Sequence, residues 1–172
     1  MAEKKVPPIA RMLPRLWATD MTLLIKMAGI IMPRVFDGFL ASLNEKERKA
    51  IDQVMPVKGG KRMYVQLLGS PTPPIVVELA QPLRLMTMPE KEVREQGIRG
   101  IRLTCDDALL AAKGMTAGAM MRLLWRLKGQ LLTMLRISWT FLPLLRLGRS
   151  GLKDIQDKMN AKTAPLLGLL GM

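Results

Sequence analysis

Residues 97–147 read GIRGIRLTCDDALLAAKGMTAGAMMRLLWRLKGQLLTMLRISWTFLPLLRL, and their apolar spacing indicates the fold of the chain. The spacing has a period of two in some parts and the period of a helix in others. It predicts a strand at 101–105, a short helix at 108–113, a longer helix at 117–128, a second strand at 131–137 and a short helix at 141–147. Asp106 is expected to cap the first of these helices, and Gly114 to end it.

Two of these elements are unusually apolar. The helix at 117–128 is apolar over most of its circumference, which leaves Arg122 and Arg126 as a narrow polar stripe. The strand at 131–137 is apolar on both faces except at Arg136. We therefore expect something apolar to lie against each face of this strand.

The preceding part of the chain supplies three more predicted strands, at 61–68, 75–80 and 83–88, in which apolar residues alternate with others. Three prolines within 69–74 favour a stiff hairpin loop between the first two. Together with the two strands described above, the pattern predicts an α+β fold. Its sheet is expected to have five mostly antiparallel strands, with helices covering one face.

The chain is expected to form one domain with added segments. Residues 1–56 are predicted as an N-terminal arm with helices packed on the domain, residues 57–150 as the core, and residues 151–172 as a C-terminal helix with an apolar tail. The helix at 21–43 is interrupted by Pro33 and carries Lys26, Arg34 and Asp37, so it is not expected to span a membrane. We expect it to pack on the domain, and an interfacial membrane helix is the alternative. Residues 44–47 form a predicted capping box for the next helix.

The segments GIRLTCDDALLAAKGM at 100–115 and LLWRLKGQLLTMLRI at 123–137 resemble the second half of the sterol carrier protein type 2 family. That family has a strand, an acidic residue opening a helix with a Leu-Leu pair, a further helix, a strand after Gly-Lys or Lys-Gly, and a closing helix. The matching positions are Ile101, Leu103, Asp106, Leu109, Leu110, Gly114, Lys128, Gly129, Leu131 and Ile137. The resemblance covers roughly residues 60 to 150. It departs from the family at Ser138-Trp139, where the family turns through a glycine with Asp or Asn.

The resemblance implies a lipid tunnel between the sheet and the helices. It also implies ligands such as sterols, fatty acids, acyl-coenzyme A, phospholipids or isoprenoid quinones. The expected lining is Met120, Leu123, Leu124, Leu127, Leu132, Met134, Leu142 and Leu145. The expected membrane-facing basic residues are Arg122, Arg126, Lys128, Arg146 and Arg149. The alternative for the apolar set is that its members pack against one another as core.

The composition favours anionic partners. The formal net charge is +13, and residues 108–153 include eight basic residues and no acidic one. Such an excess favours a membrane surface, a nucleic acid or an acidic protein, although a solvated basic face gives the same pattern. No nucleic-acid motif accompanies the basic residues, so a nucleic-acid partner is not expected. The 15 methionines favour an adaptable apolar binding surface.

The residue types argue against catalysis. The chain has no histidine, which removes a Ser-His-Asp triad, a Cys-His pair and the histidine ligands common in zinc and iron sites. Cys105, the single cysteine, is expected as a buried structural thiol. Asp106 and Asp107 are explained by capping. We expect no catalytic residue, no metal and no cofactor.

These observations favour a non-enzymatic protein that binds or transfers a lipid and meets anionic membranes through a basic face. The alternative is an interaction module with a filled core, which docks a partner protein in lipid or quinone metabolism. The missing targeting signal favours a cytoplasmic protein, peripheral to a membrane.

Overall fold

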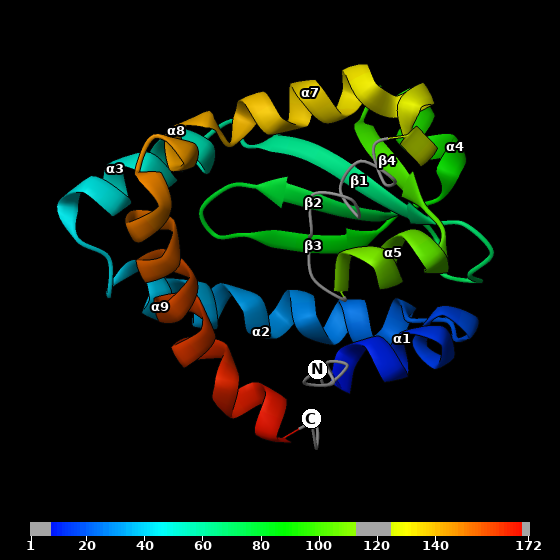
Figure 1. The fold of residues 1–172 in the computed structure, drawn as a ribbon, viewed down its shortest axis with the longest axis horizontal. Helices are drawn as coiled ribbons and strands as arrows, with labels where there is room; N and C mark the ends of the chain where they lie inside the picture. The colour runs from blue at the N-terminus through cyan, green and yellow to red at the C-terminus, as the bar shows by residue number, and fades with distance from the viewer. Residues whose placement is uncertain (1–7, 113–124, 170–172) are drawn as a thin grey trace, which may run out of the picture.

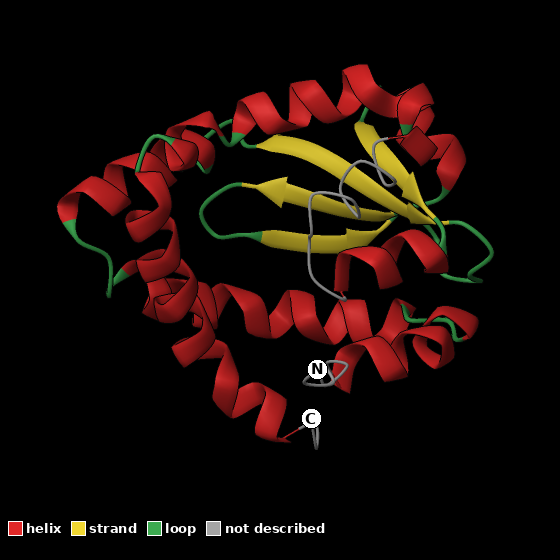
Figure 2. Ribbon diagram, viewed as in Figure 1, coloured by secondary structure: helices red, strands yellow, loops and turns green. Residues whose placement is uncertain are grey.

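The computed structural model describes residues 8–112 and 125–169, which form a sheet surrounded by helices (Figures 1 and 2). The strands are β1 (Lys61–Leu67), β2 (Ile75–Leu79), β3 (Arg84–Thr87) and β4 (Arg99–Leu103). The helices are α1 (Pro8–Ala18), α2 (Thr22–Leu40), α3 (Glu45–Val54), α4 (Glu90–Glu95), α5 (Cys105–Ala112), α7 (Leu131–Thr140), α8 (Leu142–Leu145) and α9 (Gly148–Leu169), with a 3₁₀ turn, η1 (Lys128–Gln130), before α7. The predicted α+β class is confirmed.

The described strands form a mixed sheet in the order β3-β2-β1-β4. β2 pairs antiparallel with both β1 and β3, whereas β1 and β4 run parallel. A parallel pair needs a crossover connection, and the segment containing α4 carries the chain from the β3 edge to the β4 edge. The prediction of five strands is therefore wrong, because the described residues hold four. The predicted mostly antiparallel pairing holds for two of the three strand pairs, and the β1–β4 pair is parallel.

The fifth predicted strand, at 131–137, is part of the helix α7. A short run that is apolar on both faces has no period that distinguishes a strand from a helix. In the structure the partly buried residues of this run recur at helical spacing: Thr133, Met134, Ile137 and Thr140. The opposite side of α7 is left exposed.

The side chain of Gln130, rather than a fifth strand, forms hydrogen bonds with the free edge of β4. The Gln130 Nε2 group donates a hydrogen bond to the carbonyl oxygen of Arg102 at 3.1 Å. The Gln130 Oε1 atom accepts one from the backbone N–H of Arg102 at 2.7 Å. These two bonds satisfy backbone groups that an edge strand would otherwise leave open.

The main core lies where α2 and α3 meet β2. Phe36 and Phe39 of α2 are 2% and 1% exposed, and their ring centroids are 5.6 Å apart. They pack with Ile51 and Val54 of α3 and with Leu79 of β2. Burying large aromatic side chains contributes strongly to stability, so this cluster fixes the C-terminal half of α2 on the sheet.

The N-terminal helices are also fixed to the sheet. Gly29 allows α2 to approach β3, since a Cβ atom at this position would lie 2.6 Å from the carbonyl oxygen of Leu85. The indole Nε1 of Trp17 in α1 donates a hydrogen bond to the carbonyl oxygen of Leu68 at 2.9 Å. Within the described ranges, no helix is long and apolar enough to cross a bilayer.

The opposite face of the sheet is covered by α4. Val93 of α4 is 2% exposed and packs with Val76 of β2, which is completely buried. The next residue, Val77, packs against the α2–α3 core instead, because successive strand residues point to opposite faces. Helices therefore lie on both faces of the sheet, and the prediction that they cover one face is wrong.

The start of α5 differs from the expected one. The Thr104 hydroxyl accepts a hydrogen bond from the backbone N–H of Asp107 at 3.3 Å, and the Asp107 carboxylate accepts one from the backbone N–H of Thr104 at 3.0 Å. This reciprocal pair is a capping box, so Thr104 caps α5 and Asp106 does not. The capping box predicted at 44–47 is confirmed at the start of α3.

Candidate functional site

The residues predicted to line a lipid site have unlike surroundings. Three of the eight lie outside the described residues: Met120, Leu123 and Leu124. Two are half-buried: Met134 and Leu142. Leu127 is buried, at 4% exposed, whereas Leu132 and Leu145 are 73% and 55% exposed. The two exposed leucines are therefore on the outer surface, whereas Leu127 is in the interior.

The predicted basic residues also have different surroundings. Two lie outside the described part of the chain: Arg122 and the side chain of Lys128. Two are exposed where α8 leads into α9: Arg146 and Arg149. Arg126 pairs with Asp106 at 3.6 Å and with Asp107 at 3.4 Å. Its charge is therefore partly neutralised by the start of α5.

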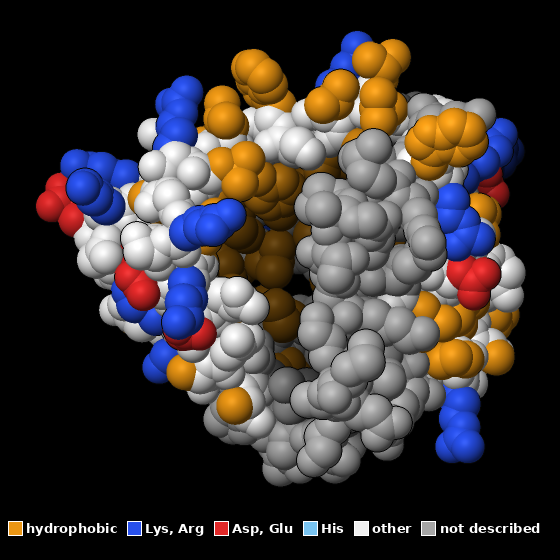
Figure 3. Space-filling view, in the orientation of Figure 1, with side chains coloured by type: hydrophobic (Ala, Val, Ile, Leu, Met, Phe, Trp, Pro, Cys, Tyr) orange, Lys and Arg blue, Asp and Glu red, His pale blue; other side chains and the backbone are white. Residues whose placement is uncertain are grey.

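The outer side of α7 is apolar and open to solvent. Four large side chains on it are between 42% and 75% exposed: Leu131, Leu132, Leu135 and Trp139. Arg136 is exposed beside them on the same helix. Figure 3 shows hydrophobic side chains that stand out from the surface over α7, with basic side chains near them. We call these four residues the α7 stripe. Exposed apolar patches often mark surfaces that contact a membrane or a protein, so the α7 stripe is a candidate for such a surface.

Next to α7 the surface is hollowed. Figure 3 shows hydrophobic side chains deep inside this hollow, and Figure 1 places α2, α8, α9 and the sheet around it. The core beneath these elements is bordered by apolar side chains that are only partly buried: Leu43, Met63, Val77, Leu83, Phe141, Leu144, Ile155 and Met159. Concave, mostly apolar surfaces of this kind suit the hydrocarbon part of a ligand.

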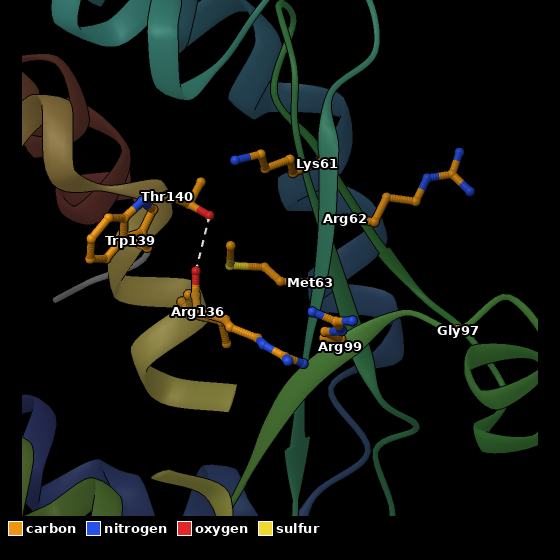
Figure 4. Close-up of a pocket in the computed structure, with 9 residues that line it drawn as sticks. Lys61, Arg62, Met63, Gly97, Arg99, Arg136, Trp139 and Thr140 are labelled. Carbon is orange, nitrogen blue, oxygen red and sulfur yellow. Dashed lines mark hydrogen bonds between the residues drawn. The ribbon is translucent and has the colours of Figure 1, made fainter. Parts of the chain in front are cut away.

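A separate pocket of about 570 Å³ lies between the second half of α7 and the beginnings of β1 and β4 (Figure 4). Its lining residues are Lys61, Arg62, Met63, Gly97, Arg99, Arg136, Ile137, Trp139 and Thr140. Sequence reasoning missed this pocket. Its one signal in the sequence was Arg136, a lone basic residue in an apolar run, and nothing in the local pattern connects it with Lys61 or Arg99.

The two faces of the sheet differ in how their charges are balanced. On the α4 side, Glu78 pairs with Arg62 at 3.3 Å and with Arg84 at 3.9 Å. On the same side, the hydrogen bond and the charge of Arg94 hold the pKa of Glu90 below its ordinary value. Three basic side chains beside α7 form no ion pair among the described residues: Lys61, Arg99 and Arg136. The pocket beside α7 is therefore electropositive.

Comparisons of the chain with protein-family models, curated proteins and solved structures found no match. The resemblance to the sterol carrier protein type 2 family thus stays a prediction from the sequence. In residues 8–112 and 125–169, no three histidine, cysteine, aspartate or glutamate side chains gather as a metal site would require.

Proposed function

We propose that the protein is a non-enzymatic lipid-binding protein. In this proposal the hydrocarbon part of a lipid occupies the hollow, and the α7 stripe rests in the interface of an anionic membrane. The observation that carries the proposal is the α7 stripe itself, since four large apolar side chains are exposed on one helix of an electropositive surface. The resemblance to the sterol carrier protein type 2 family agrees with this function and with a lipid as the ligand.

The physical basis is the behaviour of amphipathic helices at a bilayer surface. Apolar side chains of such a helix enter the boundary between headgroups and acyl chains, and nearby arginines contact anionic headgroups. A tryptophan such as Trp139 suits this boundary because its ring is apolar and its N–H is polar. The cytoplasmic leaflet carries anionic lipids, so the same reasoning favours a cytoplasmic protein peripheral to a membrane.

Flotation with lipid vesicles tests this function. We expect the protein to float with vesicles that contain an anionic phospholipid, and its affinity to fall as salt is raised. The reason is that the Debye length shortens from about 10 Å at 0.1 M salt to about 3 Å at 1 M. Equal binding to neutral and anionic vesicles would contradict the electrostatic part of the proposal. No binding to either would contradict membrane contact altogether.

The alternative function is docking of a partner protein, and the surface of α2 favours it. Five apolar side chains of α2 are exposed by 38% to 75%: Leu23, Leu24, Met27, Ile30 and Ile31. These residues share the helix with the buried Phe36 and Phe39 but face solvent. In this alternative α2, and not α7, is the functional surface, so substitutions on the two helices distinguish the two functions.

A further inference from the structure

Three basic side chains from three separate elements line the pocket beside α7. They are Lys61 of β1, Arg99 of β4 and Arg136 of α7. Figure 4 shows the guanidinium groups of Arg99 and Arg136 pointing toward one another and Lys61 extending toward Thr140, while Arg62 points away from α7. Arg99 reaches this pocket because of the parallel pairing of β1 with β4, which places Arg99 opposite Met63 in the neighbouring strand.

These three charges have no counter-charge within the part of the chain that the structure describes. Among the described residues, no carboxylate forms an ion pair with Lys61, Arg99 or Arg136. Arg62, the fourth basic residue of the lining, is paired with Glu78 instead. Like charges that face each other repel, and the repulsion is relieved when an anion lies between them. The pocket therefore has the charge of an anion site without a built-in anion.

The remaining lining defines what kind of anion fits. Met63, Ile137 and Trp139 give the pocket an apolar part, and the Thr140 hydroxyl lies at its edge. The volume of about 570 Å³ is in the range of small-molecule sites and far exceeds one inorganic anion. Arginine guanidinium groups bind phosphate oxygens in bidentate fashion. A phosphate monoester offers three non-bridging oxygens and up to two charges to the three basic groups.

We infer that this pocket binds the phosphate of a phosphate-bearing lipid, with Arg99, Arg136 and Lys61 on the phosphate and Met63, Ile137 and Trp139 on the first part of its apolar body. The inference rests on the proposed lipid-binding function and names the class of lipid. The pocket adjoins the α7 stripe through Trp139, which belongs to both. A headgroup held here is therefore next to the surface that enters the membrane.

Calorimetric titration of the full chain tests the inference with three probes: dodecyl phosphate, inorganic phosphate and the neutral dodecyl maltoside. The Arg99→Gln/Arg136→Gln variant is expected to bind dodecyl phosphate about thirtyfold more weakly, because it loses hydrogen bonds to a charged group. The control Lys91→Gln/Lys153→Gln removes the same charge from exposed positions outside the pocket and is expected to stay within about twofold of the wild type. Circular dichroism verifies that both variants are folded, and Arg99→Lys/Arg136→Lys, which keeps the charge, is expected to recover part of the affinity.

An equal loss in both glutamine variants, or no loss in either, would overturn the site. If inorganic phosphate binds as tightly as dodecyl phosphate, the assignment of a lipid as the ligand is overturned and the pocket is a site for free phosphate. Dodecyl maltoside separates this inference from the proposed function. If dodecyl maltoside binds and the affinity for dodecyl phosphate is the same with and without the two arginines, the headgroup site is refuted and the proposed lipid binding stands. If only the arginine-dependent phosphate binding is found, the pocket stands and the hollow is not a lipid site.

Discussion

Replacement of Leu132 and Trp139 by serine is expected to lower the affinity for anionic vesicles about a hundredfold. Both side chains are largely exposed, at 73% and 75%, so neither is needed to hold the protein core. Burying one large apolar side chain in an apolar phase is worth about 1.5–3 kcal/mol. The low end of this range for two side chains, about 3 kcal/mol, corresponds to roughly a hundredfold change in affinity. Vesicle flotation at fixed low salt measures the loss, and thermal unfolding shows that the fold is kept.

The matched control is the pair Leu23→Ser/Ile30→Ser on α2. These two side chains are 69% and 75% exposed, so the change in exposed apolar surface is similar. Figure 1 places α7 along the β4 edge of the sheet and α2 along the β3 edge, so one flat bilayer does not meet both helices in the same way. We expect the control to bind vesicles almost as the wild type does. If the α2 pair loses affinity and the α7 pair does not, α2 is the membrane surface and the α7 stripe has another role.

A Phe39→Ala substitution is expected to lower the free energy of unfolding by about 3–5 kcal/mol, because truncating a buried phenylalanine removes its packing and leaves a cavity. Phe39 is 1% exposed and lies between α3 and β2 beside Phe36. The expected loss is a large part of the total stability of a domain, which is about 5–15 kcal/mol. Urea unfolding followed by circular dichroism measures it.

Ile30→Ala provides the comparison for this stability prediction, since Ile30 is on the same helix but 75% exposed. Substitutions at such surface positions usually change stability by no more than about 0.5 kcal/mol. A small effect at Phe39, or equal effects at the two positions, would show that the C-terminal half of α2 is not packed on the domain. The comparison therefore tests where α2 lies independently of any ligand.

Much of the sheet was predictable because the apolar residues of its strands recur with a period of two, which a helix does not show. The strands predicted at 61–68, 75–80 and 83–88 lie within a residue or so of β1, β2 and β3. Each alternates because its two faces meet different surroundings, the α2–α3 core on one side and α4 on the other. The capping box at 44–47 was predictable for a similar reason, since its two side chains act only on neighbouring backbone groups.

The region of α7 was predicted wrongly because its local sequence does not determine its structure. A run that is apolar on both sides fits a central strand as well as a helix with one buried and one exposed side. In the structure the Gln130 side chain, and not a fifth strand, hydrogen-bonds to the edge of β4 at Arg102. These two residues are distant in sequence, so the local pattern does not reveal the contact. The basic pocket was missed for the same reason. Arg99 and Arg136 come together only because β4 runs parallel to β1 and α7 crosses beside them.

Lipid that accompanies the purified protein is the most direct evidence for or against lipid binding. The protein is purified without detergent, extracted with organic solvent and analysed by mass spectrometry, beside an unrelated protein of similar size purified in the same way. We expect a lipid in near-stoichiometric amount, with phosphate-bearing species enriched over neutral ones. An extract with no more lipid than that of the unrelated protein would contradict lipid binding and favour the docking of a partner protein.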